Sequence, residues 1–258
     1  MKFSANLGFL WADLPLPEAI RAAKLAGFDA VECHWPYDES ASEIAEVLKD
    51  TGLTMLGLNT RRGNAEMGEF GLSAVPGRED EARETIDEAL TYAKAIGCLN
   101  VHVMAGIASG EAAKQTFVNT LKYACARAAG QGTTILIEPL NTYDAPGYFL
   151  KGTDQALAII QAVDASNLKL MFDCYHVQLL EGDLSHKLSV LLRWIGHIQF
   201  ASVPDRGQPD HGEVNYAHVF QVITDLGYSA PLGAEYKPVG PTDQSLRWMK
   251  SLCPKATR

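Results

Sequence analysis

The feature that most constrains the fold of this chain is a regular alternation of short apolar segments with amphipathic helical segments. The apolar segments lack strict polar–apolar alternation, which is typical of parallel strands buried on both faces. They lie at residues 3–8, 29–33, 54–58, 100–104, 134–138, 169–173, 197–201 and 232–236. Between them, apolar residues recur at helical spacing, as in the series Ala82, Ile86, Ala89, Ala93 and Ile96. Eight buried strands, each followed by a helix-sized segment, predict an α/β fold with parallel strands.

Glycine marks the boundary between several helical segments and the strands that follow them. Gly27, Gly52, Gly97 and Gly227 each stand directly before an apolar segment. Glycine just after the last helical turn adopts the left-handed conformation that ends a helix at little cost. With no linker in the chain, this pattern predicts a single (β/α)8 TIM barrel over residues 1–258, a fold that typically takes about 250 residues. A doubly wound open sheet is the alternative, but the G-x-G-x-x-G motif of such sheets is missing after the first strand.

Composition limits where the protein works and what it binds. Thirty-one Asp and Glu against 22 Lys and Arg leave a formal net charge of −9, which argues against nucleic acid as a partner. No apolar run approaches the roughly 18 residues of a membrane span, and the start of the chain lacks a signal-peptide core. We therefore expect a cytoplasmic protein that binds neither nucleic acid nor membrane. The five cysteines, which form no C-x-x-C pair, agree with a reducing compartment: Cys33, Cys98, Cys125, Cys174 and Cys253.

Polar residues stand at the ends of four consecutive predicted strands, where the rim of a (β/α)8 barrel carries its chemistry. They are Glu138, Asp173, Gln199 and Glu235. Burying a charge is costly unless it is paired or coordinated, and three carboxylates on neighbouring strands would repel one another. Carboxylate and amide oxygens are ligands that suit Mg²⁺ or Mn²⁺. Any one of these residues alone is more often a salt-bridge partner, but together they predict a divalent metal site.

Other polar residues near the rim are weaker candidates. Glu32 and His34 follow the second strand, where contact with the site and hydrogen bonding to loops are equally good explanations. His102, on the fourth strand, is more readily explained as a hydrogen-bonded interior residue than as a ligand. Cys174 is expected to pack. The sequence shows no Ser/His/Asp or Cys/His nucleophile arrangement, no P-loop and no H-E-x-x-H motif.

Motifs over nearly the whole chain carry a resemblance to a known family. They are KFSANL, GFDAVE, PYD, GEFGLSAVPGRE, VHVMAG and IEPLN, followed by PGYFL, FDCYH, EGDL, GHIQ, PDRGQPDHGEVNY and GAEYKP. The last six are individually distinctive and stand in family order. On these motifs the chain resembles the hydroxypyruvate isomerase family, within the xylose isomerase-like barrels that also include ketose 3-epimerases and endonuclease IV.

The resemblance implies roles for several rim residues. Glu138 and Glu235 match the acid–base pair of the family, which also binds metal, and Asp173 and Gln199 match the remaining ligands. His176 matches the histidine that contacts substrate. Ketose 3-epimerases usually have histidine at the position of Gln199. Endonuclease IV needs more histidines than the seven present here and a basic DNA-binding face, so that relative is disfavoured.

The resemblance further implies an isomerase that interconverts a small hydroxy-oxo acid through a metal-stabilised enediolate, with hydroxypyruvate to 2-hydroxy-3-oxopropanoate as the type reaction. One glutamate would remove a proton and the other would return it to the adjacent carbon. Which glutamate acts first stays open. The nearest alternative is a 2-oxo-tetronate isomerase, whose substrate is one carbon longer. Residues 60–76 would set the size of the pocket for it. A ketose 3-epimerase is the next alternative. An endonuclease IV-like phosphodiesterase and a non-catalytic sugar-acid binding protein are the least favoured functions.

An acidic substrate needs a cation near the site. Arg206, in the loop after the seventh strand, is the first choice, because arginine can hold a carboxylate through two parallel hydrogen bonds. Lys237, beyond Glu235, is a second candidate for substrate binding. The Arg61–Arg62 pair after the third strand is a third, and solvated loop charges explain that pair at least as well. Whether the protein forms a homo-oligomer stays open.

Overall fold

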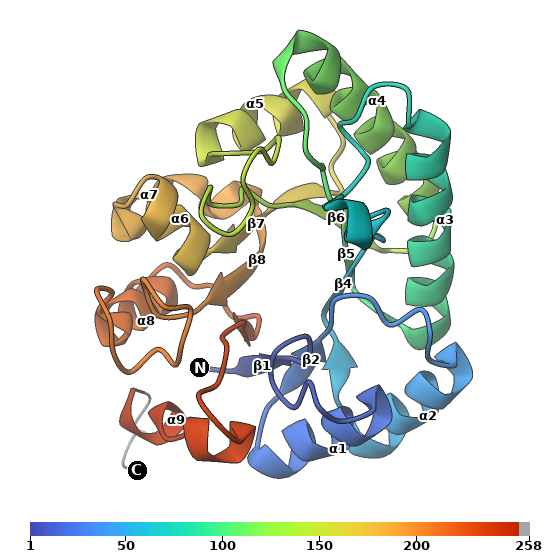
Figure 1. The fold of residues 1–258 in the computed structure, drawn as a ribbon. Coiled ribbons are helices and arrows are strands. Elements are labelled where there is room, and N and C mark those ends of the chain that lie inside the picture. The colour runs from blue at the N-terminus through green and yellow to red at the C-terminus, as the bar shows by residue number, and fades with distance from the viewer. Residues whose placement is uncertain (253–258) are drawn as a thin grey trace.

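Nine short parallel strands form one sheet in the computed structural model, which describes residues 1–252 (Figure 1). The order in the sheet is β3–β2–β1–β9–β8–β7–β6–β5–β4. All eight predicted strand segments are present, and the fold is the predicted barrel. The final residues of the predicted domain, Cys253 included, lie outside the described residues. The strands are β1 (Phe3–Asn6), β2 (Ala30–Glu32), β3 (Thr54–Met55), β4 (Gly57–Asn59), β5 (Asn100–His102), β6 (Thr134–Ile137), β7 (Leu168–Asp173), β8 (Ile195–Phe200) and β9 (Leu232–Ala234).

The segment that carries β3 and β4 closes the sheet into a barrel. We predicted one strand over residues 54–58, whereas the structure has two, at opposite edges of the sheet order. β3 pairs with β2, and β4 pairs with β5. Between them, the Leu56 amide donates to the carbonyl of Val31 at 2.7 Å. Because one continuous segment bonds first to one neighbour and then to the other, the two edges of the sheet meet in a ring.

Helices surround the strands on the outside (Figure 1). In α3 the predicted apolar face from Ala82 to Ile96 is buried, as its helical spacing requires. Three predicted glycine caps are confirmed, because Gly27, Gly52 and Gly97 end their helices in the left-handed conformation. The helices of the described chain are α1 (Leu16–Ala26), α2 (Ala41–Thr51), α3 (Glu79–Ile96), α4 (Gly110–Ala128), α5 (Thr153–Val163), α6 (Cys174–Leu180), α7 (Leu184–Leu191), α8 (Tyr216–Asp225) and α9 (Trp248–Ser251), with short 3-10 turns η1 (Ala65–Met67), η2 (Leu192–Trp194) and η3 (Thr242–Ser245).

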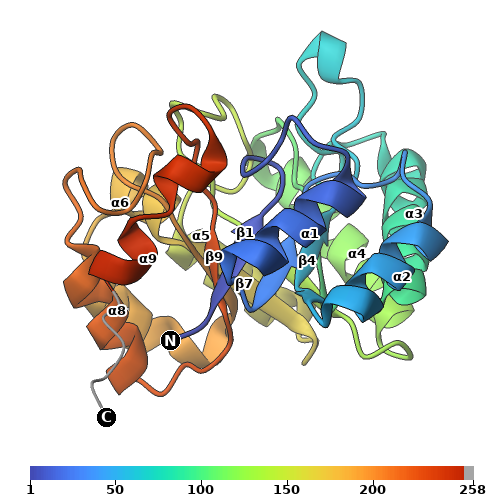
Figure 2. The same cartoon turned by 90° about the horizontal axis from the view of Figure 1, so that it is seen from below.

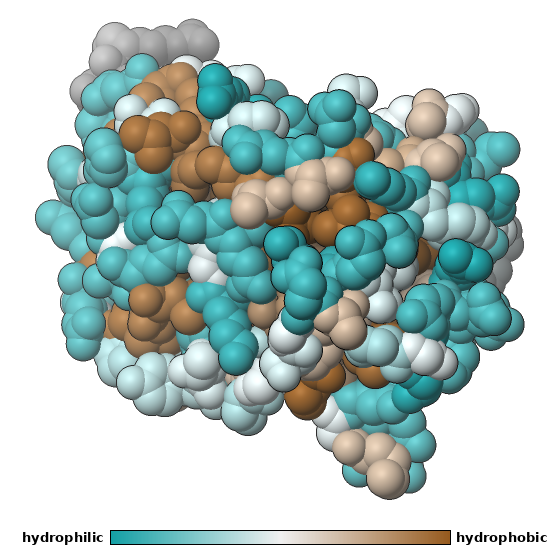
Figure 3. Space-filling view, turned by 90° about the horizontal axis from the view of Figure 1, so that it is seen from above, coloured by the Kyte–Doolittle hydropathy of each residue, from teal (hydrophilic) through white to brown (hydrophobic). Residues whose placement is uncertain are grey.

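The loops that follow the strands gather on one side of the barrel, which is uppermost in Figure 2. One of them, residues 61–71 with η1 near its tip, projects beyond the others, and we call it the arm. The arm forms the lobe at the lower right of the space-filling view in Figure 3, where hydrophilic and hydrophobic residues mix on its surface. Within residues 1–252, no helix has the length and apolar character needed to cross a membrane.

Candidate active site

A cavity of about 290 Å³ opens among the loops at the carboxyl ends of the strands. Charged and polar side chains from distant parts of the chain line it together with the rings of Phe9, Trp35 and Phe70. A smaller pocket, lined in part by Glu32 and Gln199, shares Glu138, Glu235 and His102 with it. The polar residues that line the larger cavity include His34, Arg62, His102, Glu138, Asp144, His176, Arg206 and Glu235.

Glu138 follows β6 directly and is buried, as the sequence predicted for a strand-end carboxylate. Burial and the negative charges of Glu235 and Asp173 raise the pKa of Glu138 well above the usual range of a glutamate. Its Oε2 lies 3.7 Å from Nδ1 of His102. Burial lowers the pKa of His102 to about 4, so this neighbour is neutral at pH 7 and supplies no positive charge. Glu138 is therefore a buried carboxyl group with little positive charge nearby to favour its ionised form.

Asp173 and Gln199 are neighbours on β7 and β8, in register with one another. Asp173 ends β7 and caps α6, where one carboxylate oxygen accepts the Tyr175 amide hydrogen at 2.9 Å. Burial and the charge of Glu235 raise the pKa of Asp173 well above its usual range. Its second oxygen and the side-chain oxygen of Gln199 are both buried and accept no hydrogen bond from the described chain.

Glu32 controls which end of the Gln199 amide is left free. Its Oε1 accepts hydrogen bonds from Nε2 of Gln199 at 2.8 Å and from Nδ2 of Asn6 at 3.1 Å. Its Oε2 lies 2.6 Å from Nε2 of His197. Because Oε1 of Glu32 accepts from the Gln199 nitrogen, the amide oxygen of Gln199 points the other way and accepts no hydrogen bond from the described chain. Residues that do not bind a metal ion themselves often orient its ligands through hydrogen bonds of this kind.

Glu235 follows β9 and is the most fully hydrogen-bonded of the three carboxylates. Its Oε1 accepts from Nδ2 of Asn6 at 3.0 Å and lies 3.1 Å from Nε2 of His34. Its Oε2 accepts from the Arg206 guanidinium at 2.7 Å. Burial opposes ionisation here, but the charge of Arg206 and the contact with His34 outweigh it and lower the pKa of Glu235. Glu235 and Glu138 thus face one cavity with pKa values displaced in opposite directions.

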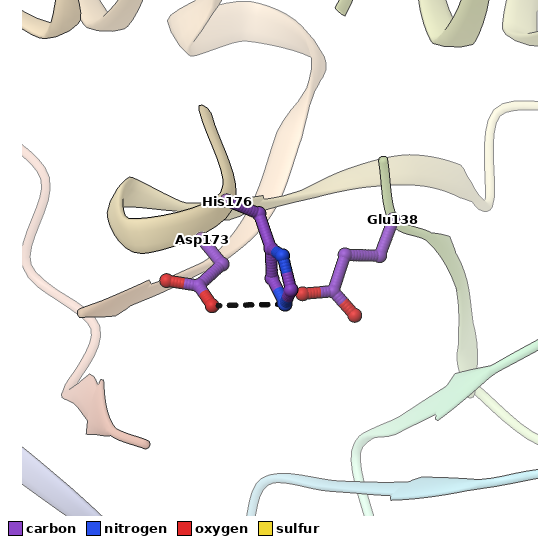
Figure 4. A group of neighbouring side chains, drawn as sticks. All are labelled: Glu138, Asp173 and His176. Atoms are coloured by element: carbon purple, nitrogen blue, oxygen red, sulfur yellow. Dashed lines mark ion pairs between the residues drawn. The ribbon is translucent and has the colours of Figure 1, made fainter. Parts of the chain in front are cut away.

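His176 projects from α6 toward the carboxylates of Asp173 and Glu138 (Figure 4). Its Nδ1 accepts the backbone amide hydrogen of Asn141 at 3.1 Å and lies 2.8 Å from the side-chain nitrogen of Asn141. The Asn141 oxygen is occupied by the amides of Tyr143 and Asp144, which establishes the orientation of that side chain. Burial lowers the pKa of His176 to about 3, so the ring is neutral. With Nδ1 an acceptor, Nε2 carries the hydrogen and is a donor toward the cavity.

The residues predicted to bind metal fit a divalent cation. Glu138, Asp173 and Gln199 each present a buried oxygen that accepts no hydrogen bond from the described chain. Buried acceptors need a donor or a cation, and an all-oxygen set suits Mg²⁺ or Mn²⁺. Ligand atoms of Glu138, Asp173 and His176 lie within 4.8 Å of one another. The protonated Nε2 of His176 makes that residue a hydrogen-bond donor rather than a ligand, so the carboxylates and Gln199 remain the better set.

The predicted cations occupy different positions. Arg206 lies between the rings of Phe9 and Tyr175, each 5.0 Å from its guanidinium carbon. Lys237 is exposed, and its ammonium lies 5.7 Å from the centre of the Phe9 ring rather than among the residues that line the cavity. Of the Arg61–Arg62 pair, only Arg62 lines the cavity.

Several residues of the site were not assigned from the sequence. Asn6 bridges Glu32 and Glu235, and Asn141 sets the tautomer of His176. Asn6 is the last residue of β1, a polar residue at a strand end like Glu138, whereas Asn141 lies beyond β6 in the loop motif IEPLN and gave no such signal. The sequence alone is equally consistent with site and loop roles for Glu32 and His34, and the structure places both in contact with predicted site residues.

Comparison with known proteins agrees with the fold. The family model described as "Xylose isomerase-like TIM barrel" matches residues 20–252. The chain is 44% identical to the 2-oxo-tetronate isomerase of Cupriavidus necator, over 96% of this chain and 97% of that protein. It is 38% identical to the hydroxypyruvate isomerase of Escherichia coli, over 96% and 98%. A solved structure from Brucella melitensis, titled as an AP endonuclease of family 2, superposes with a TM-score of 0.93 at 40% identity, over 97% and 98% of the two chains.

Proposed function

This chain belongs to the xylose isomerase-like TIM barrel family, and we propose that it is an isomerase of small hydroxy-oxo acids. The preferred reaction interconverts hydroxypyruvate and 2-hydroxy-3-oxopropanoate. The names of its full-length relatives support the isomerase class. The observation that carries the proposal is the pair Glu138 and Glu235, which line one cavity from β6 and β9 with pKa values displaced in opposite directions.

The two glutamates are suited to move a proton between adjacent carbons of a bound substrate. A pair of titratable groups whose surroundings separate their pKa values can divide the roles of acid and base. One glutamate removes the proton from the carbon beside the carbonyl, and the other delivers a proton to the neighbouring carbon. Glu138 has a free carboxylate oxygen for this exchange, and Asn6, His34 and Arg206 hold Glu235 in place.

Neighbouring side chains orient the substrate and stabilise the charge that develops on its oxygens. His176 offers its Nε2 hydrogen to a substrate oxygen. Arg206 places a positive charge beside Asp173 and Glu235. A divalent cation held by Glu138, Asp173, Gln199 and Glu235 would supply Lewis-acid polarisation of the substrate carbonyl. Lys237 stays a predicted substrate contact, although it is not among the residues that line the cavity.

Four other activities differ from this proposal in testable ways. A 2-oxo-tetronate isomerase would use the same residues on a substrate with one more carbon, and the relative at 44% identity favours it as the second candidate. A ketose 3-epimerase would return the proton to the carbon that lost it. The AP endonuclease title of the Brucella structure describes that protein, whereas the net charge of −9 of this chain does not favour a DNA substrate. A non-catalytic binding protein would have no need of an acid–base pair.

The proposal also covers the cellular location of the enzyme and its binding partners. Cys33, Cys98, Cys125 and Cys174 are free and buried, which agrees with a cytoplasmic location. A small molecule is the expected partner rather than nucleic acid or membrane, and a homo-oligomer stays open.

Proton NMR in D₂O tests the proposal directly. The purified protein, supplied with Mn²⁺ or Mg²⁺, is incubated separately with hydroxypyruvate, 2-oxo-tetronate and fructose, with heat-inactivated protein as control. We expect hydroxypyruvate to be converted, with deuterium entering the product at the carbon that becomes protonated. Faster conversion of 2-oxo-tetronate would make the second candidate the function. Conversion of fructose alone would overturn the assignment to acidic substrates.

A further inference from the structure

Arg61 and Arg62 are adjacent in sequence, but their side chains lie in different places: Arg61 pairs with Glu88 outside the cavity, and Arg62 lines the cavity. The Arg61 guanidinium makes two hydrogen bonds to the Glu88 carboxylate, at 2.8 and 3.2 Å, and lies over the Tyr37 ring. The Arg62 guanidinium lies over the Trp35 ring, 4.4 Å from its centre, and lines the cavity. No acidic side chain of the described residues lies within ion-pair distance of Arg62, so its positive charge is available to a ligand.

Arg206 is the other arginine that lines the cavity, and acidic side chains of the chain already compensate its positive charge. Its guanidinium lies 2.7 Å from Glu235, 3.3 Å from Asp144 and 3.9 Å from Asp173. A substrate carboxylate placed there would compete with three acidic side chains that the same guanidinium already contacts. At Arg62 an incoming carboxylate would meet no such competition from the described chain. Of the cations in the cavity lining, Arg62 is therefore the better site for a substrate carboxylate.

Backbone contacts hold Arg62 at the base of the arm. Its carbonyl accepts the amide hydrogen of Gly71 at 2.9 Å, and Gly71 in turn forms an antiparallel bridge with Ala105 beyond β5. Gly71 has a φ of +112°, and a Cβ at this position would lie 2.5 Å from the carbonyl oxygen of Met104. Only glycine fits that approach. The base of the arm is thus anchored to the barrel while its tip projects away.

Trp35 is held beside Arg62 by the same segment. Its indole hydrogen bonds to the carbonyl of Thr60 at 3.0 Å, two residues before Arg62. A guanidinium stacked on an aromatic ring keeps its in-plane N–H groups free, and those groups match the two oxygens of a carboxylate. Phe70 and Leu140 contribute apolar surface to the same cavity.

We propose that Arg62, stacked on Trp35, binds the carboxylate of the substrate and makes the enzyme select hydroxy-oxo acids over neutral hydroxy-ketones. This inference rests on the proposed function and adds the residue that recognises the acid. Hydroxypyruvate and 2-oxo-tetronate both carry a carboxylate on a carbon that takes part in the isomerisation, so Arg62 serves either substrate. Arg62 thereby determines charge selectivity and leaves chain-length selectivity to other residues.

The test compares Arg62→Met with Arg61→Met, a matched control that removes the neighbouring stacked arginine outside the cavity. Kinetics are measured with hydroxypyruvate and with dihydroxyacetone, in which a hydroxymethyl group replaces the carboxylate. A charge-assisted hydrogen-bonded pair predicts that Arg62→Met raises the KM for hydroxypyruvate by roughly 10- to 100-fold. The kcat/KM for dihydroxyacetone should change by less than about 2-fold, and Arg61→Met should leave both substrates within the same limit. Arg62→Lys, which keeps the charge without the planar fork, should fall between wild type and Arg62→Met.

A binding measurement separates this inference from the proposed function. Glycerate and glycerol differ in the carboxylate and cannot be isomerised, so calorimetric titration with each reports on Arg62 whether or not turnover is found. Glycerate binding that weakens at least about 10-fold in Arg62→Met, with glycerol binding unchanged, supports the inference. Equal losses for the acid and the neutral compound in Arg62→Met would overturn it, as would an equal effect of Arg61→Met. Failure of the wild-type protein to convert any hydroxy-oxo acid would instead overturn the proposed function.

Discussion

The guanidinium of Arg206 lies 2.7 Å from Oε2 of Glu235, and the two groups come from loops that follow neighbouring strands, β8 and β9. Arg206 has a φ of +54°, a conformation that side-chain-bearing residues seldom adopt. The loop therefore accepts local backbone strain while the guanidinium contacts Glu235. The contact keeps Glu235 ionised despite its burial.

Arg206→Met should act through Glu235 and so affect substrates regardless of their charge. We expect kcat to fall at least about 10-fold for both hydroxypyruvate and dihydroxyacetone, since an adjacent positive charge typically displaces a carboxyl pKa by one unit or more. Steady-state kinetics with both compounds check this. A rise in KM for hydroxypyruvate alone would instead show that Arg206 binds the substrate carboxylate, as first expected from the sequence.

Glu138→Gln and Glu235→Gln should each lower kcat at least about 10²-fold, the lower end of what a positioned acid or base contributes. Both residues are also proposed metal ligands, so the metal content of each variant must be measured with its turnover. A fully metallated Glu235→Gln enzyme with near-normal kcat would remove Glu235 from the proton transfer.

Chelation should abolish activity, and Mn²⁺ or Mg²⁺ should restore it. The reason is the set of buried acceptors on Glu138, Asp173 and Gln199, which the described chain leaves without donors. Added metal at about 100 times its Kd should raise the Tm by roughly 5 °C or more. Full activity in exhaustively stripped protein would refute the metal assignment.

The stability of the metal-free protein should fall as pH rises above about 7, because the lowered pKa values of His102 and His176 oppose the fall up to the ordinary histidine pKa of about 6.5. The folded state raises the pKa of Glu138 and Asp173, so their contribution to stability is complete below the ordinary carboxyl pKa and is lost as pH rises through the raised values. Glu235, whose pKa is lowered, contributes in the opposite sense, and its contribution is lost only as pH falls below that range. Denaturant unfolding in chelator between about pH 7 and about pH 9, above the ordinary histidine pKa, measures the slope. Glu138→Gln should reduce that slope, and an unchanged slope would contradict the assignment to Glu138.

Glu32→Gln should weaken metal binding by about 10- to 100-fold, as the loss of an outer contact to a ligand typically does. An amide at this position could donate as well as accept, so it would no longer hold Gln199 with its oxygen free. Metal titration by calorimetry checks the change, with Glu43→Gln on the exposed face of α2 as control. If Glu32 acts through Gln199, then Glu32→Gln combined with Gln199→Leu should bind metal no worse than Gln199→Leu alone. Additive losses would assign Glu32 a separate role.

The sequence by itself determined the barrel and the carboxylates of its rim. Strand and helix patterns are local, so the apolar runs before Glu138 and Asp173 were enough to place both residues at the ends of parallel strands. The split of the third predicted strand into β3 and β4 was missed, because it depends on pairing with two different neighbours.

The tertiary structure alone decided how these residues act. Asn6 contacts Glu235 across 229 positions of sequence, and His197 contacts Glu32 across 165. Likewise, only the packing of the arm separates Arg62, over Trp35 in the cavity lining, from Arg61, paired with Glu88. The physical reason is that pKa values, tautomers and ion pairs depend on the charges and donors within a few ångströms, and in a closed barrel those neighbours come from remote strands and loops.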